Sequence, residues 1–300
     1  MDSVKKLKTE SGLSLYHPWV SFVYFVAVIA GTLLFIHPVF VGVSLLCAIF
    51  ASAMINGRKT VFATLGFGIP MFIFIALANP LFNHRGATTL FYLFDNPVTL
   101  EAIVYGIVSA GMMFAAVVWF TCYNTVVTSD KFIYIFGRIL PSVALIVSMT
   151  LSLIPRLLAQ VKVIADSQRS IGLDWKSGSL MQRIRSGARI LSILVSWALE
   201  DAVITADSMR ARGYGQHKRS TFSIFRFGKK DAKMLALVLV LFTAEIFTYV
   251  SGRGTMEFYP AIVFRNIDFI DIIIYVLYIT LGILPAVIQI KEDLKWKLLK

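Results

Sequence analysis

Residues 19–36 read WVSFVYFVAVIAGTLLFI, a run of eighteen residues that contains no charged side chain. A helix that crosses the hydrocarbon core of a bilayer needs about 20 predominantly apolar residues, and this run is close to that length. The apolar core of a signal peptide is shorter, about 7–15 residues, so the run is predicted to be a membrane span although Lys5, Lys6 and Lys8 precede it. Three further charge-free runs of similar length follow it: Val39–Ile55, Val61–Ala78 and Ala102–Phe120.

The composition of all 300 residues points to the same class of protein. Hydrophobic residues make up 57% of the chain and charged residues 15%, with a mean hydropathy of +0.75. Soluble domains hold about 45–50% apolar and about 25% charged residues, so a water-soluble globule is excluded. Two more apolar runs lie near the C-terminus, Met234–Val250 and Ile272–Ile290. The sequence therefore predicts an all-α, polytopic helical membrane protein of about six spans.

Basic residues are distributed unevenly along the chain, which carries a net charge of +12. Residues 156–230 contain fourteen basic and five acidic residues, so this segment accounts for +9 of the total. The segment lacks zinc-finger spacing and an aromatic RNA-binding pattern, so nucleic acid is not an expected partner. Lys and Arg accumulate on the cytoplasmic side of membrane spans. With the N-terminus inside, 26 basic residues lie inside and only Arg85, Arg253 and Arg265 outside, which predicts a multi-pass cell-membrane protein with both termini in the cytoplasm.

We expect three parts along the chain: a four-span membrane domain at 1–128, a cytoplasmic helical module at 129–230 and a two-span region at 231–300. Within the module, Val143–Ile154 is apolar but only about twelve residues long, which favours an interfacial or partly buried helix over a full crossing. In Leu180–Met209 apolar residues recur mostly at steps of three, four and seven, which predicts one amphipathic helix about 45 Å long. We expect no internal repeat.

Motifs of catalysis are missing from the sequence. It contains no HExxH, GxSxG, Walker A or CxxC pattern, and its four histidines are scattered over predicted loops and turns. We therefore expect neither an enzyme nor a metal site, and no cofactor of the chain's own. If ATP drives the protein, partner subunits must bind the ATP.

Glu245 is the one carboxyl deep within a predicted span. Ionisable residues in membrane spans are costly and are functional candidates by default, which would make Glu245 a proton or ion site. The alternative is a structural role, in which the carboxyl faces the protein interior and makes one interhelical hydrogen bond. One isolated carboxyl is weak evidence for ion transport, so the structural interpretation is favoured.

A resemblance to a known family rests on four stretches of sequence. Residues 204–215 read ITADSMRARGYG and follow SWALEDAV at the end of the long amphipathic helix. The others are NPLFNHRG at 79–86, SDKFIYIFGRILPSVALIVSMTLSLIPRLL at 129–158 and GSLMQRIRSGARILSILVSWALE at 178–200. In this order the stretches resemble the transmembrane coupling (T) subunit of energy-coupling factor (ECF) transporters, over roughly residues 14–230.

The resemblance implies a function in ATP-driven import of a vitamin or other micronutrient. In that family the T subunit binds two cytoplasmic ABC-type ATPase subunits through a pair of crossed coupling helices. It also contacts a small substrate-binding membrane protein, the S subunit, within the lipid bilayer. A dedicated cobalt or nickel version of the subunit is an alternative within the same class. An ion-coupled carrier centred on Glu245 is an alternative of a different class.

The resemblance places the second coupling motif at Ala211, Arg212 and Gly213, and the chemistry of these residues suits a docking helix end. A small alanine lets the helix end enter a groove. Arg212 offers a planar fork of N–H donors to acidic or carbonyl acceptors. Gly213 ends the helix without a Cβ clash.

The first coupling motif departs from the family pattern. Residues 165–174 read ADSQRSIGLD, so Ser170, Ile171 and Gly172 stand where the family has Ala-Arg-Gly. The glycine is kept and the arginine is missing. Arg169 lies two residues before Ile171 and points to a different helix face, so we expect it to replace the arginine only in part.

Overall fold

The computed structural model describes residues 12–93, 96–137, 139–173, 179–216, 225–263 and 268–298. These residues are mainly helical, which confirms the predicted fold class, and they include one short β-hairpin. The chain divides into two compact units, of which the first joins Met1–Phe132 to Phe225–Lys300 and the second is Ile133–Ile224. The second unit falls within the segment 129–230 that the sequence analysis treats as one module.

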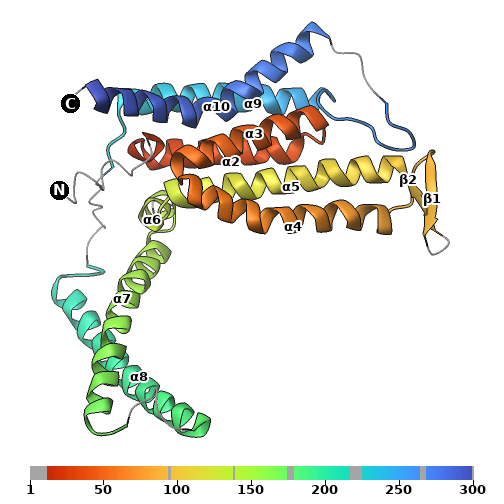
Figure 1. Ribbon diagram of the computed structural model, residues 1–300. Helices are drawn as coiled ribbons and strands as arrows, with labels where there is room; N and C mark the ends of the chain where they lie inside the picture. The colour runs from red at the N-terminus through yellow and green to blue at the C-terminus, as the bar shows by residue number, and fades with distance from the viewer. Residues whose placement is uncertain are drawn as a thin grey trace. The chain divides into compact units, whose positions relative to one another are not determined.

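The first unit is a bundle of apolar helices that run alongside one another (Figure 1). The helix α5 lies at its centre and packs against α2, α3 and α4, while α9 packs on α2, and α10 on α3 and α9. The elements of the bundle are η1 (Gly12–Leu15), α2 (Pro18–Leu34), α3 (Pro38–Ile55), α4 (Arg58–Phe82), α5 (Leu100–Val126), α9 (Lys229–Val250) and α10 (Phe269–Leu298).

Close contact between α4 and α5 depends on small residues. The ring of Phe114 on α5 lies directly over Gly68 on α4, where an added Cβ would come within 2.0 Å of the ring. At Gly106 on α5 an added Cβ would lie 2.8 Å from the carbonyl oxygen of Ala76 on α4. In a bilayer, helix association relies on van der Waals packing, which small residues improve because they let two backbones approach. A larger residue at either glycine would push the two helices apart.

The hairpin lies at one end of the bundle, between α4 and α5, in the connection that also holds Arg85, a residue predicted to lie outside (Figure 1). It pairs β1 (Thr89–Leu93) with β2 (Asn96–Thr99) in antiparallel register. The loop between α9 and α10 reaches the same end, where Asn83 Nδ2 donates to Tyr259 Oη at 2.9 Å. Segments expected on the same side of the membrane thus share one end of the bundle.

The second unit holds most of α6 (Ser129–Gly137), all of α7 (Pro141–Ser170) and all of α8 (Leu180–Ala211). The prediction of a separate short helix at Val143–Ile154 is wrong, because α7 continues through Pro155 for 30 residues. Proline removes one backbone donor and tends to kink a helix without always ending it. The long amphipathic helix predicted at 180–209 is confirmed as α8, with two further residues at its C-terminal end.

Within the described residues, six helices are long and apolar enough to cross a membrane: α3, α4, α5, α7, α9 and α10. Their number agrees with the prediction, but their membership differs. The first predicted span became α2, which is apolar but only 17 residues long, whereas α7 has the length and hydropathy of a span. The helix α7 is included because it continues through Pro155, well beyond the apolar stretch at 143–154.

Candidate functional site

The helices α7 and α8 cross each other within the second unit (Figure 1). Arg156 Nη1 on α7 lies 3.5 Å from Asp201 Oδ2 on α8, with both side chains partly open to solvent. Such an exposed ion pair contributes only about 0–1 kcal/mol to stability. Along the two helices, which the structure describes throughout, Ile164 and Ile190 are the buried residues. The two helices therefore cover each other only over a small area.

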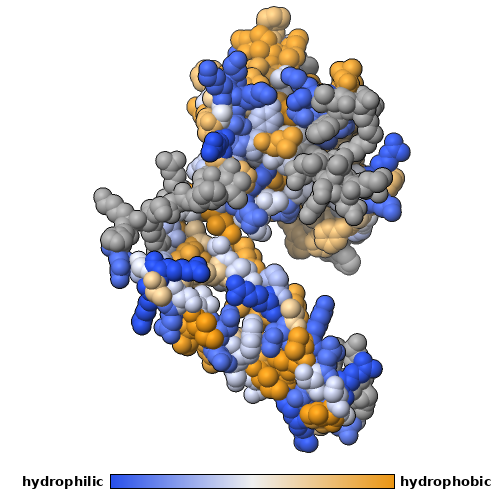
Figure 2. Space-filling view, turned by 90° about the vertical axis from the view of Figure 1, so that its left-hand side faces the viewer, coloured by the Kyte–Doolittle hydropathy of each residue, from blue (hydrophilic) through white to orange (hydrophobic). Residues whose placement is uncertain are grey.

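Most apolar side chains of α7 and α8 are consequently exposed. On the face of this unit seen in Figure 2, hydrophobic patches lie between charged side chains. A soluble surface rarely leaves so many large apolar residues uncovered, and such patches mark contacts with proteins or membranes. The exposed residues include Val163 and Ile171 on or next to α7, and Leu191, Val195, Leu199, Val203 and Ile204 on α8.

The C-terminal end of α8 has a defined backbone geometry. Arg212 is the C-cap residue and Gly213 follows it with a φ of +78°, a conformation that favours glycine. The amide of Gly213 donates to Arg210 O at 2.9 Å, and the amide of Tyr214 donates to Met209 O at 3.0 Å. This pair of hydrogen bonds is the Schellman motif, which satisfies carbonyls at the end of a helix.

The C-terminal end of α7 repeats both of these hydrogen bonds. Ile171 is the C-cap residue, and Gly172 follows it with a φ of +81°. The amide of Gly172 donates to Arg169 O at 3.0 Å, and the amide of Leu173 donates to Gln168 O at 3.0 Å. The two helix ends are therefore structural equivalents.

The two helix ends also resemble each other in sequence. This likeness corrects the expectation that the chain has no internal repeat. Residues 165–173 read ADSQRSIGL and residues 206–214 read ADSMRARGY, with five identical positions out of nine. Ser167 Oγ donates to Val163 O and Ser208 Oγ donates to Ile204 O, each at 2.8 Å and at matching positions. The same kind of helix end thus occurs twice in the chain.

The repeat fixes which side chains correspond. Arg169 corresponds to Arg210, and Ile171 corresponds to Arg212, the alignment that the sequence analysis uses. Ile171 is 67% exposed, and Arg212 is also exposed. At the same backbone position one end therefore offers an apolar side chain and the other a guanidinium. All seven residues of the proposed coupling site lie at these two ends, and their binding role stays a prediction.

Glu245 on α9 lies in the interior of the bundle, where its residue is 5% exposed. Its carboxylate sits against Gly31 of α2, at which an added Cβ would be 2.6 Å from Oε2. Neither carboxylate oxygen has a hydrogen-bond partner among the described residues. The expected interior position is confirmed, whereas the interhelical hydrogen bond expected of a structural role is not found. The described residues also contain no group of three or more potential metal ligands.

A hydrogen-bonded network that the sequence analysis does not single out joins four helices of the bundle. Thr32 Oγ1 lies 2.7 Å from Ser44 Oγ and 3.4 Å from Tyr278 Oη, and Trp119 Nε1 donates to Ser44 Oγ at 3.1 Å. Polar side chains of this kind link helices within membranes. Thr32 and Ser44 are polar residues within charge-free apolar runs, a signal that could have drawn attention to them, but their position in the sequence does not reveal their partners.

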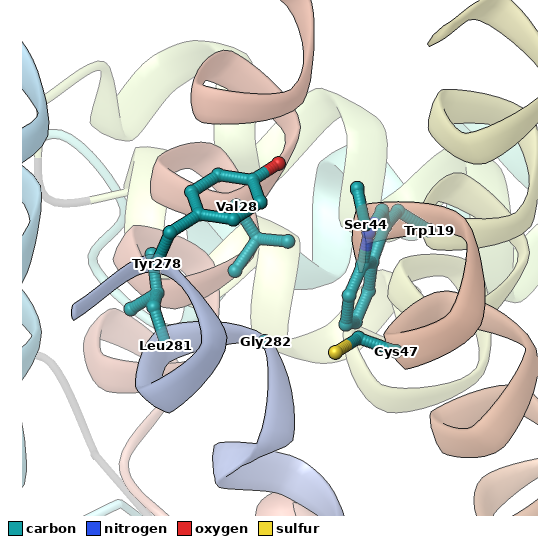
Figure 3. A pocket seen from close by; sticks show the side chains of 7 residues that line it. All are labelled: Val28, Ser44, Cys47, Trp119, Tyr278, Leu281 and Gly282. Carbon is teal, nitrogen blue, oxygen red and sulfur yellow. The ribbon is translucent and has the colours of Figure 1, made fainter. Parts of the chain in front are cut away.

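Next to this network lies a cavity of about 10 Å³, room for one water molecule at most (Figure 3). The rings of Tyr278 and Trp119 lie on either side of it. The cavity is too small for an organic substrate. It is lined by Val28, Ser44, Cys47, Trp119, Tyr278, Leu281 and Gly282.

Several proteins resemble the chain in sequence. The protein named energy-coupling factor transporter transmembrane protein EcfT from Lactobacillus helveticus is 33% identical over 100 residues, which are 33% of this chain and 36% of that protein. The protein of the same name from Bacillus selenitireducens is 34% identical over 104 residues, 34% of this chain and 38% of that protein. The uncharacterized protein MG181 homolog from Mycoplasma pneumoniae is 31% identical over 115 residues, 38% of this chain and 26% of that protein. The matched stretches thus span between about a quarter and two fifths of these relatives.

A family match covers a larger part of the chain. Residues 15–223 match the CbiQ family, described as cobalt transport protein. The matched range begins in the first turn of the bundle and ends beyond α8, so it includes both repeated helix ends. With the apolar helices of the bundle, the match identifies a multi-pass membrane protein of a transporter family. The chain belongs to the CbiQ family, to which the T subunits of ECF transporters are related.

Proposed function

We propose that this chain is the transmembrane coupling subunit of an ECF-type ABC importer. In this role it passes the ATP-driven motion of two cytoplasmic ATPase subunits to a substrate-binding membrane subunit. The observation that carries the proposal is the repeated helix end: two crossed helices present the same Schellman geometry, once at Gly172 and once at Gly213. Two equivalent docking ends suit two related partners.

The two helices suit the transmission of a displacement. At a rise of about 1.5 Å per residue, the 30 residues of α7 and the 32 residues of α8 are each about 45 Å or more in length. Their exposed apolar side chains leave ample surface for partners to cover. A partner that grips a capped helix end moves the helix as a body, since the cap keeps its last turn intact.

The proposal assigns ATP to the partner subunits. The sequence has no Walker A pattern, so the chain itself is taken to be a non-catalytic permease subunit without a cofactor. Arg212 would bind acidic or carbonyl groups of one ATPase, and Ile171 would contact an apolar groove of the other. Ala211, Gly213, Arg169, Ser170 and Gly172 complete the two docking ends.

The transported substrate is proposed at the level of class, a vitamin or other micronutrient. A dedicated cobalt or nickel permease subunit is the second candidate, because the description of the matched family names cobalt. In either case the substrate would be selected by another membrane subunit. An ion-coupled carrier centred on Glu245 is a third candidate, since that carboxyl is buried without a hydrogen-bond partner among the described residues.

Purification of the chain from its native membrane separates these candidates. The expected result is a complex with two ATPase subunits and a small membrane protein, and with no ATP hydrolysis by the isolated chain. The small membrane protein, tested with vitamins and with Co²⁺ or Ni²⁺, then gives the substrate. Substrate uptake by the chain alone, in liposomes without ATP, would instead support the carrier and contradict the coupling role.

A further inference from the structure

A short segment near the N-terminus, residues 12–17, contacts both places where the chain passes between the two units. The chain leaves the first unit after Phe132 and returns to it at Phe225. The residues that the segment contacts there, Lys131, Phe227 and Asp231, belong to the first unit. We call residues 12–17 the N-terminal clamp.

At the first passage, Lys131 ties the clamp to the end of α5. Its Nζ donates to Ser14 O of the clamp at 2.7 Å and to Val126 O, the last residue of α5, at 3.0 Å. Val126 O is one of the carbonyls that a helix leaves without an intrahelical partner, and a cation at that end is favoured by the helix dipole. Lys131 is only 6% exposed, and a buried ammonium is costly unless its donors are used. These contacts hold the first turn of α6 in one place.

At the second passage, Asp231 and Phe227 join the clamp to the start of α9. The amide of His17 donates to Asp231 Oδ1 at 3.0 Å, while Asp231 Oδ2 accepts from the amide of Gly228 at 2.9 Å. The ring of Phe227 packs edge-on against the His17 ring with centroids 5.1 Å apart. One carboxylate therefore fixes both the helix start and the clamp.

The clamp is itself held firmly by the bundle. Leu13 is 1% exposed within the main hydrophobic core, and its carbonyl accepts from Ser21 Oγ of α2 at 3.0 Å. The amide of Gly12 donates to Gln289 Oε1 of α10 at 2.6 Å. An added Cβ at Gly12 would lie 3.0 Å from Ile288, so the clamp lies tightly on α10.

We propose that the N-terminal clamp is the anchor through which movement of the second unit reaches the membrane helices, with Lys131 and Asp231 as its positioning residues. A loose connection would absorb the motion of α7 and α8 at the passages between the units. A connection fixed to α2, α5, α9 and α10 at once passes that motion to the bundle. This proposal rests on the proposed coupling function and adds the residues that make it productive.

The test measures substrate uptake per ATP hydrolysed by the full complex in proteoliposomes. Lys131→Met keeps the length of the side chain and removes its charge and donors, whereas Lys131→Arg keeps both. Asp231→Asn weakens the second passage and keeps one acceptor oxygen. Lys230→Met is the matched control, because Lys230 is an exposed lysine beside Asp231.

We expect Lys131→Met and Asp231→Asn to retain both ATPases and their ATP hydrolysis. Uptake per ATP should fall about tenfold, because a factor of about ten corresponds to the free energy that a hydrogen bond to a charged group typically contributes. Lys131→Arg should recover most of the uptake and Lys230→Met should retain it. Unchanged uptake per ATP in Lys131→Met would overturn the proposal. So would a parallel loss of ATPase binding and uptake in both passage variants, which is the result of a merely structural role.

A second measurement tests the anchor independently of the proposed coupling function. Hydrogen exchange of the purified chain alone reports whether the passages are held. Amides of α6 should exchange about tenfold faster in Lys131→Met than in Lys131→Arg, because the charged hydrogen bonds are lost. If the unsubstituted chain binds no ATPase, the proposed function fails, and equal exchange in the two variants would independently overturn the anchor.

Discussion

The two residues that differ most between the repeated helix ends occupy the same backbone position. Ile171 and Arg212 are both C-cap residues, each followed by a glycine with a positive φ. The backbone is thus held constant while the side chain changes from apolar to cationic. If each end binds one ATPase, as we propose, this one side chain would set the specificity of each end for its partner.

The first prediction concerns Ile171 and the partner groove that receives it. An arginine placed in an apolar groove would be a buried charge without a partner, which costs several kcal/mol. Ile171→Arg should therefore lower the amount of one ATPase in the purified complex, and Ile171→Leu should leave both ATPases at normal levels. The ratio of the two ATPases to the chain is the measurement. Tighter ATPase binding by Ile171→Arg would show that the groove is acidic.

A second prediction at the residue scale concerns two histidines that begin helices. His17 precedes Pro18 and accepts from the amide of Trp19 through Nδ1, and His37 does the same for the amide of Val39. Burial lowers the pKa of both imidazoles, and Asp231 near His17 and Asp271 near His37 offset this only in part. The fold therefore favours the neutral imidazole, whose Nδ1 can accept.

A group with a lowered pKa in the folded state stabilises the fold above its ordinary pKa, about 6.5 for histidine, and this stability is lost as the pH falls below that value. The melting temperature of the purified chain should thus fall between about pH 7 and pH 5. His17→Asn combined with His37→Asn should flatten this fall, because asparagine is a good N-cap that does not titrate. His84→Asn, at a histidine that caps no helix, is the control. An equally steep fall in the double variant would rule out the caps as its source.

At the scale of elements, the sequence predicts the apolar helices of the bundle well, because a long charge-free run has few alternatives to a membrane helix. The prediction fails at Pro155, because a proline can either end a helix or lie within one. Pro155 interrupts an apolar run, yet α7 passes through it, since the loss of one backbone hydrogen bond did not end the helix. The sequence relates the two helix ends only through the family resemblance, because five shared positions in nine do not stand out as an internal repeat until the backbone shows that they coincide.

The predicted site residues lie at the helix ends, but their hydrogen-bond geometry could not be read from the sequence. Gly213 indicates a helix stop, whereas the Schellman bonds that make the two ends equivalent depend on backbone angles. The N-terminal clamp was also beyond sequence reasoning. Lys131 and Ser14 are 117 positions apart, and no periodic pattern relates a lysine to a backbone carbonyl at that distance.

The third prediction concerns the contact between α9 and α2 at Glu245. The carboxyl packs on Gly31 and has no hydrogen-bond partner among the described residues. Gln keeps the size and hydrogen-bonding capacity of the side chain while removing its charge. Glu245→Gln should therefore leave uptake and its pH dependence nearly unchanged, with Glu257→Gln on an exposed loop as the control. Abolished uptake in a normally assembled complex would restore Glu245 as an ion site.

At the scale of the whole molecule, the division into a bundle and a second unit of exposed helices fits a protein that works only within a complex. The fourth prediction is its orientation in the membrane, which rests on the excess of basic residues on one side. Single cysteines are placed at Arg85, Lys59 and Lys229 after Cys47 and Cys122 are replaced. A membrane-impermeant maleimide added to intact cells should label position 85 and leave positions 59 and 229 unlabelled. Labelling at 59 and 229 with none at 85 would reverse the orientation.

The central claim is that motion enters this protein at the end of α8, through Arg212. Removing one partner of a desolvated charged contact costs roughly 2–5 kcal/mol, enough to weaken an assembly severely. Arg210→Ala is the matched control, because it removes an arginine from the same helix end, two residues before the C-cap. The decisive measurement is ATPase co-purification together with ATP-driven uptake for the two variants. We predict that Arg212→Ala loses an ATPase or its uptake while Arg210→Ala is milder, whereas an Arg212→Ala protein with normal assembly and uptake would contradict the account.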